Sequence, residues 1–260
     1  MKKVKVIQYG LGPIGCGIVK AVSMHSQMEL VGVVDIDPDK VGKELNKIIS
    51  LNCNANLKVC SSLAEALDGK SADAAIHCTS SKLGNVVDQL KEMLNAGLHV
   101  ISTCEELAYP WYRFPKLSED IDNSAKKAEK ALVGTGVNPG FAMDMLPLVY
   151  NHAVLDVKEI RIERVLDAGR RRGSLQKKVG AGMEISEFMA FVADEKIGHA
   201  GFIESIALLA AGLGWELDEI KQQILPVIAE ENIRTEFLEV KAGQVAVLTR
   251  VGGVANKVKN

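Results

Sequence analysis

The 260-residue sequence lacks the features that mark membrane proteins, disulfide-rich proteins and nucleic-acid-binding proteins. No apolar run approaches the length of a membrane span, and the N-terminal stretch MKKVKVIQYG has no signal-peptide core. The five cysteines are odd in number and include no C-x-x-C pair, which argues against a disulfide framework or a zinc site. The formal net charge of -2 gives no reason to expect nucleic acid or a membrane surface as a partner. We therefore expect a cytoplasmic protein.

Metal-binding patterns and repeats are also missing. No combination of His, Cys and carboxylate residues has convincing metal spacing, so we expect no metal. Apolar residues make up 47% of the chain and charged residues 25%, as in ordinary globular proteins, and the length suits two modest domains or one large one. Most of the cysteines should be small buried residues. Cys78 and Cys104 differ because each lies at the end of a predicted strand.

The chain begins with a complete phosphate-binding pattern. Residues 3–9 (KVKVIQY) predict a buried strand, G-x-G-x-x-G follows at once, and a helical run comes next. Gly10 allows a tight turn, Gly12 lets the backbone approach a pyrophosphate, and Gly15 lets helix and strand pack closely. The helix N-terminus supplies N–H groups and a positive dipole end for phosphates. The predicted cofactor loop comprises Gly10, Gly12, Pro13, Ile14 and Gly15.

An acidic residue follows the second predicted strand. Residues 30–34 are apolar and lead into Asp35, which lies 20 residues after Gly15. A carboxylate at this place accepts hydrogen bonds from the adenosine ribose and repels a 2′-phosphate, so the sequence favours NAD. Lys40 and Lys43 lie close enough in the sequence to soften this preference, so NADP stays possible. The alternative is a solvated turn acid.

The first half of the chain alternates strands and helices. This alternation predicts an α/β fold with a Rossmann-type, doubly wound parallel sheet. We expect further strands at 57–60, 74–78, 99–103 and 132–136. We expect helices at 38–50, 82–96 and 118–130, and a short one that a capping box opens at Ser62 and Gly69 ends.

The second half predicts a smaller α+β domain. We expect a helix over 140–155 interrupted by Pro147, an alternating strand over 157–168, a basic loop over 169–182, and helices over 184–194, 202–213 and 215–226. Two strands, 235–241 and 244–251, are expected to form a hairpin around Ala242-Gly243. We predict a dinucleotide-binding domain over 1–136 and a substrate and dimerisation domain over 137–260. A homodimer is expected because such sheets often bury one face against a second subunit.

Ligands of open α/β sheets bind beyond the carboxyl ends of the strands. This rule selects Cys78, Thr79 and Ser80, whose small side chains leave space for a cofactor or cap the next helix. It also selects Thr103, at the end of the following strand. Asn138 precedes a proline in a constrained turn and either contacts the cofactor or substrate or has only a structural role.

Two adjacent carboxylates and a basic segment are the candidates for chemistry on the substrate. Near a reacting amine, Glu105 or Glu106 can take a proton and then stabilise an iminium cation, although either can instead be a helix N-terminal acid. In the basic segment, guanidinium groups can bind a substrate carboxylate in bidentate fashion. A solvated loop is the alternative. The substrate-binding candidates are Arg171, Arg172, Gln176 and His199.

Five motifs together resemble one family. They are GLGPIG (10–15), VISTCEELAYPW (100–111), GVNPGFAMDMLPL (136–148), DAGRRRGSLQKKVGAG (167–182) and IGHAGFIESIALLAAGLGW (197–215). The combination is similar to the 2,4-diaminopentanoate dehydrogenases and to native amine dehydrogenases. The wider fold is similar to that of dihydrodipicolinate reductase. The likeness covers about residues 1 to 245.

The resemblance implies an NAD(P)-dependent oxidative deamination. The substrate would be 2,4-diaminopentanoate, oxidised at C4 to 2-amino-4-oxopentanoate and ammonia during ornithine degradation, or a related small amine. It also implies that Glu105 first, and Glu106 second, is the catalytic carboxylate. Members of this family are longer than this chain, so we expect a C-terminal truncation or frameshift that leaves the substrate domain incomplete. The alternatives are a dihydrodipicolinate-reductase-like imine reductase and an inactive NAD(P)-binding protein.

Overall fold

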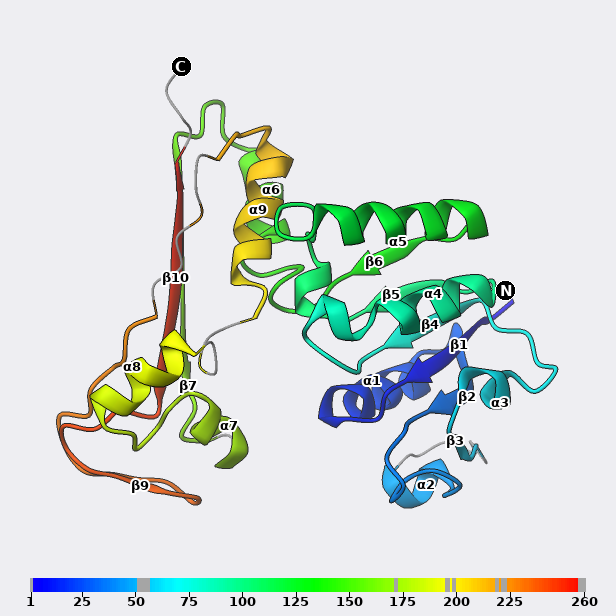
Figure 1. Ribbon diagram of the computed structural model, residues 1–260, viewed down its shortest axis with the longest axis horizontal. Helices are drawn as coiled ribbons and strands as arrows, with labels where there is room; N and C mark the ends of the chain where they lie inside the picture. Colours follow the sequence, from blue (N-terminus) through cyan, green and yellow to red (C-terminus); the bar gives the residue numbers. More distant parts are fainter. Residues whose placement is uncertain are drawn as a thin grey trace. The chain divides into compact units, whose positions relative to one another are not determined.

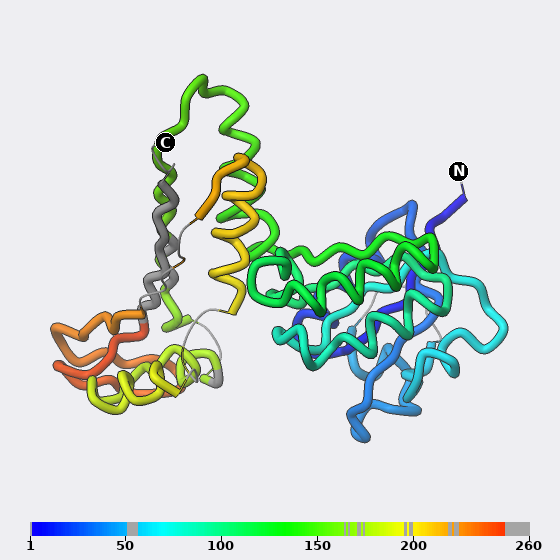
Figure 2. The backbone as a smooth tube through the Cα atoms, turned by 45° about the horizontal axis from the view of Figure 1, so that its top comes forward, coloured from blue at the N-terminus to red at the C-terminus, as the bar shows by residue number. Residues whose placement is uncertain are grey.

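The structure is a computed structural model that describes residues 2–50, 57–170, 173–194, 197, 200–217, 220 and 224–256. The chain forms two compact units, Met1–Met145 and Leu146–Asn260 (Figures 1 and 2). The division therefore falls later than the boundary that we placed after residue 136. Between the two positions lies a folded turn, in which the backbone N–H of Gly140 donates to the Asp144 carboxylate and that of Ala142 to the carbonyl of Val137.

The first unit is built on a six-stranded sheet in the order β3-β2-β1-β4-β5-β6, and each neighbouring pair is parallel. This order confirms the predicted Rossmann-type doubly wound sheet. The order reverses between β1 and β4, so the ligand crevice of such a sheet lies at their carboxyl ends. The strands are β1 (Val4–Tyr9), β2 (Met28–Val34), β3 (Val59–Cys60), β4 (Ala74–His77), β5 (His99–Ser102) and β6 (Leu132–Gly134).

Helices cover both faces of this sheet. Alternate residues of β1 point to opposite faces, so Val6 packs with α1 while Ile7 packs with the core beneath α3, α4 and α5. Val33 joins the core beneath α1 and α2. The helical elements of this unit are α1 (Pro13–Met24), α2 (Leu45–Ile48), α3 (Leu63–Leu67), η1 (Leu83–Asn85), α4 (Val87–Asn95), η2 (Glu105–Leu107) and α5 (Pro115–Ala128).

The helix expected over 38–50 is wrong, because only Leu45–Ile48 is helical. The Asp37 carboxylate accepts a hydrogen bond from the backbone N–H of Asp39, and Gly42 has a φ of +79°, so the chain turns here. Local turn chemistry therefore replaces the helix. The helix expected over 82–96 is divided at Val86 into η1 and α4.

The second unit contains two antiparallel strand pairs, which confirms the predicted α+β character. β7 (Glu159–Asp167) pairs with β10 (Leu248–Asn256) along the whole of both strands, and β8 (Ile233–Arg234) pairs with β9 (Glu239–Val240). Figure 1 shows β10 as a long strand that lies against β7. The helices are α6 (Met145–Asn151), α7 (Gly173–Lys178), α8 (Ile185–Ala193) and α9 (Phe202–Leu213).

Four expectations for this unit are wrong in detail. The strands on either side of Gly243 do not form a hairpin, because β9 pairs with β8 and β10 pairs with β7. The described residues of 215–226 form no helix, and the stretch 140–155 is helical only over α6. The basic loop contains a short helix, α7.

Among the described residues, no helix has the length and apolar character needed to cross a membrane.

Candidate functional site

The glycine loop lies where β1 meets β4. Gly10 has a φ of +95°, and a β-carbon there would lie 2.5 Å from the carbonyl oxygen of Cys78. A β-carbon at Gly15 would lie 2.0 Å from the carbonyl oxygen of Gly10. Gly12 differs, because a β-carbon there would meet no atom within 4 Å. The loop therefore packs tightly on both sides of Gly12 and leaves space in front of it.

This space adjoins the N-terminus of α1. The 12-residue helix begins at Pro13 after an extended Gly12, and no side chain caps its first turn. Pro13 and Ile14 are exposed beside it. The N–H groups of the first helical turn have no partner within the helix, and the positive end of the helix dipole lies beside them, so both attract anions. The loop therefore fits the pyrophosphate of a dinucleotide.

Asp35 lies beside this loop, at the carboxyl end of β2. Its carboxylate accepts hydrogen bonds from the backbone N–H of Leu11 at 2.6 Å and of Asp37 at 2.8 Å. The Lys40 ammonium lies 3.6 Å from the Asp35 carboxylate and 3.0 Å from that of Asp37. The Lys40 hydrogen bond lowers the pKa of Asp37. Asp35 thus holds the glycine loop in place, and its role in ribose binding stays a prediction.

The residues after β4 occupy the same edge. The backbone N–H of Cys78 donates to the carbonyl of Tyr9, and Thr79 is exposed. The Ser80 hydroxyl accepts from the backbone N–H of Lys82 at 3.2 Å and from the side-chain amide of Asn85 at 3.4 Å. Ser80 therefore holds the turn that precedes η1, although Lys82 and not Ser80 is the N-cap residue of this helix.

Glu105 and Glu106 lie in η2, directly after β5, and differ sharply in environment. The buried Glu106 carboxylate accepts a hydrogen bond from the backbone N–H of Leu83 at 2.7 Å and lies 3.6 Å from the Arg113 guanidinium. Glu105 is half-buried, and its carboxylate has no hydrogen bond or ion pair with any described residue. The two neighbouring carboxylates therefore differ in burial and in their contacts with the described residues.

Thr103 and Cys104 connect β5 to these carboxylates. The backbone N–H of Thr103 donates to the carbonyl of His77, so the ends of β4 and β5 lie together. Cys104 is buried, and its thiol donates to the carbonyl of Ser81 at 3.3 Å. Burial, more than any other cause, raises the pKa of the Cys104 thiol to about 12, so the group stays protonated at neutral pH. A nucleophilic role for Cys104 is not supported.

A buried histidine, His77, connects these two strand ends. His77 Nδ1 lies 2.8 Å from the Ser102 hydroxyl, and Nε2 lies 2.8 Å from both the Gln89 side-chain oxygen and the Thr79 hydroxyl. Burial is the main cause that lowers the pKa of His77, so its ring is neutral near pH 7. The available signal was position, because His77 and Ser102 are each the last residue of a strand that ends at the site.

The remaining candidates are placed differently. Asn138 is half-buried and follows β6, in the turn that Asp144 closes. Gln176, in the second unit, is buried and donates to the carbonyl of Gly169 while accepting from the Thr235 hydroxyl, so its amide supports the local fold. Three substrate-binding candidates lie outside the described residues: Arg171, Arg172 and His199.

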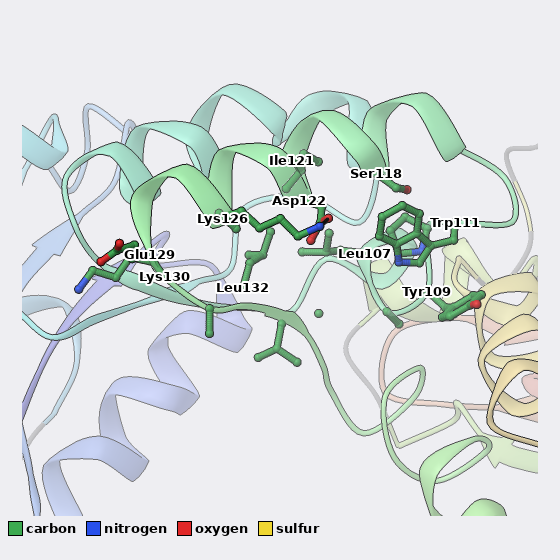
Figure 3. Close-up of a pocket in the computed structure, with 16 residues that line it drawn as sticks. Leu107, Tyr109, Trp111, Ser118, Ile121, Asp122, Lys126, Glu129, Lys130 and Leu132 are labelled. Atoms are coloured by element: carbon green, nitrogen blue, oxygen red, sulfur yellow. Dashed lines mark ion pairs between the residues drawn. The ribbon is translucent and has the colours of Figure 1, made fainter.

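A hollow of about 520 Å³ lies beside the edge strand β6 and beneath α5. Figure 3 shows Tyr109 and Trp111 at one end of it and Glu129 and Lys130 at the other. None of the predicted site residues lines it. The candidate site is therefore the carboxyl edge of the sheet and not this hollow. Among the described residues, no cluster of His, Cys, Asp or Glu side chains is arranged to hold a metal ion.

Comparison with known proteins finds a family model and relatives that are similar to this chain in sequence. The family model of the 2,4-diaminopentanoate dehydrogenase C-terminal domain matches residues 141–259. The 2,4-diaminopentanoate dehydrogenase of Acetoanaerobium sticklandii is 31% identical over 248 residues, which are 95% of this chain and 70% of that protein. An amine dehydrogenase of Streptomyces virginiae is 23% identical over 84% of this chain and 62% of its own length.

A solved structure shares the fold. The amine dehydrogenase from Mycobacterium smegmatis superposes with a TM-score of 0.78 at 23% identity, covering 97% of this chain and 75% of that one. The parallel sheet, the glycine loop and the acid after β2 define the class of NAD(P)-dependent oxidoreductases. Within that class, the chain belongs to the 2,4-diaminopentanoate dehydrogenase family. The family match extends to residue 259, past the point near residue 245 where we ended the resemblance.

Proposed function

We propose that this protein oxidises the C4 amine of 2,4-diaminopentanoate, or of a closely related small amine, with NAD as the preferred acceptor. The observation that carries this proposal is the 31% identity to a 2,4-diaminopentanoate dehydrogenase over 95% of the chain. The likeness covers both the cofactor unit and the second unit, which the C-terminal family model matches by itself. We place the reaction in ornithine degradation in the cytoplasm.

Glu105 is the proposed proton acceptor. Its carboxylate lies at the end of β5, is partly exposed, and has no partner among the described residues. Near neutral pH the substrate amine is mostly in its protonated, ammonium form. The nitrogen must lose this proton to free its lone pair before a hydride can leave the adjacent carbon. Glu105 removes that proton. Its negative charge then stabilises the iminium cation that forms on the substrate.

The reaction balances with one water molecule. A hydride leaves C4 of the substrate and reduces the oxidised nicotinamide, which supplies the electron-pair acceptor when it is bound. Water then adds to the carbon of the iminium, and the C–N bond breaks. One substrate molecule in its ammonium form, one oxidised cofactor and one water give one ketone, one ammonium ion, one reduced cofactor and one proton.

The preference for NAD rests on Asp35. Its carboxylate lies beside the glycine loop and would meet a 2′-phosphate with like charge. Lys40 offsets part of this charge, so NADP is accepted more weakly. Arg171, Arg172 and His199 are proposed to bind the substrate carboxylate.

A coupled product assay tests the proposed reaction. Purified protein is mixed with 2,4-diaminopentanoate and NAD⁺, and NADH and ammonia are both quantified. We expect equal amounts of the two products and no activity with 2-aminopentanoate, which lacks the C4 amine. Calorimetry measures NAD⁺ binding in parallel. Binding of NAD⁺ without any turnover of the diamine would contradict the proposal and favour an inactive cofactor-binding protein.

A homodimer is also proposed. The second unit exposes several large apolar side chains in and just after α6, and exposed apolar clusters mark association surfaces. These residues are Val149, Tyr150, Val154 and Leu155. Light scattering should give twice the chain mass, and Leu155→Glu should lower it towards the mass of one chain. A monomer in the unmodified protein would contradict this.

A further inference from the structure

The hydrogen bonds around His77 have one consistent set of directions. The backbone N–H of Cys104 donates to the Ser102 hydroxyl oxygen, so the single hydroxyl proton of Ser102 is free to donate to His77 Nδ1. At the other end, the Thr79 hydroxyl donates to the Gln89 side-chain oxygen at 2.7 Å. The Gln89 oxygen can only accept, so its 2.8 Å contact with Nε2 requires an N–H on Nε2, and this N–H is shared between the Gln89 oxygen and the Thr79 hydroxyl oxygen.

This arrangement needs a neutral ring that carries its proton on Nε2. Burial favours the neutral form, because a charged imidazole would lose its hydration without an acidic partner. Each polar atom in this network of side chains around His77 then has a hydrogen-bond partner. Buried networks of this kind hold their members in one geometry. Tyr9, whose ring centroid lies 5.7 Å from that of His77, is also neutral, because burial raises its pKa to about 12.

We infer that His77 is a positioning residue that joins the cofactor side of the site to its catalytic side. Through Nε2 it orients Thr79, an exposed residue at the cofactor crevice. Through Nδ1 and Ser102 it fixes the backbone of Cys104, which directly precedes Glu105. The catalytic half of this inference rests on the proposed function, whereas the cofactor half needs only NAD⁺ binding.

The same directions fix what Thr79 can offer a ligand. Its hydroxyl proton is held by Gln89, so the exposed oxygen is left as an acceptor. It therefore suits an O–H or N–H donor of the cofactor, such as a ribose hydroxyl, and not a phosphate oxygen.

Two substitutions of His77 separate its two contacts, because each keeps one contact and removes the other. In His77→Asn the shorter amide reaches only the position of Nδ1, so the Ser102 contact is kept and the Thr79 contact is lost. In His77→Gln the longer amide reaches the position of Nε2, with the opposite result. We expect His77→Asn to weaken NAD⁺ binding about tenfold while kcat at saturation is kept. We expect His77→Gln to keep NAD⁺ affinity and to lower kcat on the order of 10²-fold, since catalysis tolerates little misplacement.

Controls separate positioning from folding. Gln89→Leu, at a half-buried position on α4, should reproduce the loss of NAD⁺ affinity without changing the core. His99→Gln is the matched histidine control, because His99 lies at the start of β5 and accepts a hydrogen bond from the backbone N–H of Ala131. It should leave NAD⁺ affinity and kcat unchanged. Thermal unfolding is followed for every variant.

The outcomes distinguish this inference from the proposed function. Equal changes of NAD⁺ affinity and kcat in His77→Asn and His77→Gln, or no change in either variant, would overturn the positioning role. If the unmodified protein binds NAD⁺ but does not oxidise the diamine, the proposed function fails. The contrast in NAD⁺ affinity between the two His77 variants then decides the positioning role alone.

Discussion

The carboxylate of Glu106 accepts a 2.7 Å hydrogen bond from the backbone N–H of Leu83, which joins the turn after β5 to the turn after β4. The preceding residue, Glu105, makes no such bond within the described part of the chain. Two neighbouring carboxylates therefore have different tasks. One holds the site together, and the other is left available for chemistry.

Substituting Glu105 should remove activity and leave stability unchanged. Glu105→Gln keeps the shape of the side chain but cannot take a proton, so we expect kcat to fall about 10²- to 10⁴-fold. The midpoint of thermal unfolding and the NAD⁺ dissociation constant should stay at the values of the unmodified protein. Steady-state kinetics, calorimetry and thermal unfolding check the three expectations. Full activity in this variant would remove Glu105 from the mechanism.

Glu106→Gln is the matched control for Glu105→Gln. We expect it to lower stability and to keep activity. The amide keeps an oxygen for the N–H of Leu83 but loses the charge that faces Arg113. A hydrogen bond to a charged group is worth about 1 kcal/mol more than a neutral one, so the free energy of unfolding should fall by about that amount. Denaturant titration measures this. A loss of kcat as large as in Glu105→Gln would mean that the two roles are exchanged.

Substituting alanine for Gly12, Gly15 or Gly17, at or near the start of α1, should affect stability and NAD⁺ binding differently. In Gly15→Ala the new β-carbon would lie 2.0 Å from the carbonyl oxygen of Gly10, so we expect a destabilisation of about 1–3 kcal/mol. In Gly12→Ala it enters open space, so folding is kept, but the methyl group takes the place of the pyrophosphate. NAD⁺ affinity should then fall by about tenfold or more. Calorimetry and denaturant titration separate the two effects.

Gly17→Ala supplies the control in the same helix. Gly17 is exposed within α1, and a β-carbon there meets no atom within 4 Å. Alanine is the better helix former, so stability should rise by up to about 1 kcal/mol while NAD⁺ binding is unchanged. A normal NAD⁺ affinity in Gly12→Ala as well would place the pyrophosphate elsewhere.

The sequence predicted the first unit well because its signals are local. Buried strands, a glycine loop and terminating glycines such as Gly69 depend on neighbouring residues, and a parallel sheet then follows from their alternation. Pairing between distant strands is different. The stretch after Gly243 has the pattern of a strand, but only the folded chain shows that its partner is β7 and not the adjacent β9.

The site was predictable to the level of the strand ends and no further. The rule for open sheets placed Asp35, Thr79 and Glu105 at one edge. It could not assign different roles to Glu105 and Glu106, because that difference depends on the N–H of Leu83, which is distant in the sequence. It also could not select His77, because the contacts that connect this residue to the site come from Ser102 and Gln89.

Removing the charge of Asp35 should change the cofactor preference. Asp35→Asn keeps an oxygen for the N–H of Leu11, so the glycine loop should stay in place. Like charges about 5 Å apart at a protein surface repel by roughly 3 kcal/mol, and each 1.4 kcal/mol is about tenfold in affinity. The ratio of NADP⁺ to NAD⁺ affinity should therefore rise at least tenfold. Asp37→Asn, which also loses a contact with Lys40, is the control and should leave the ratio unchanged.

The neutral state of His77 should make the protein sensitive to mild acid. Burial lowers its pKa in the folded state below the ordinary value of about 6.5 that it regains on unfolding. Above about pH 6.5 both states are neutral, and this residue contributes no pH dependence. Below it the unfolded chain binds a proton that the folded protein does not, so stability falls as pH falls, by up to about 1.4 kcal/mol per pH unit, until the folded-state pKa is reached.

His77→Gln removes this proton uptake, so its stability should depend less on pH below about 6.5 than that of the unmodified protein. Denaturant titration of the cofactor-free protein at several pH values measures both slopes, and His99→Gln serves as the matched control because it leaves His77 in place. Identical slopes in the unmodified protein and in His77→Gln would show that the ring takes up its proton equally in both states. That result would contradict the buried, neutral histidine on which the connection between Thr79 and Cys104 depends.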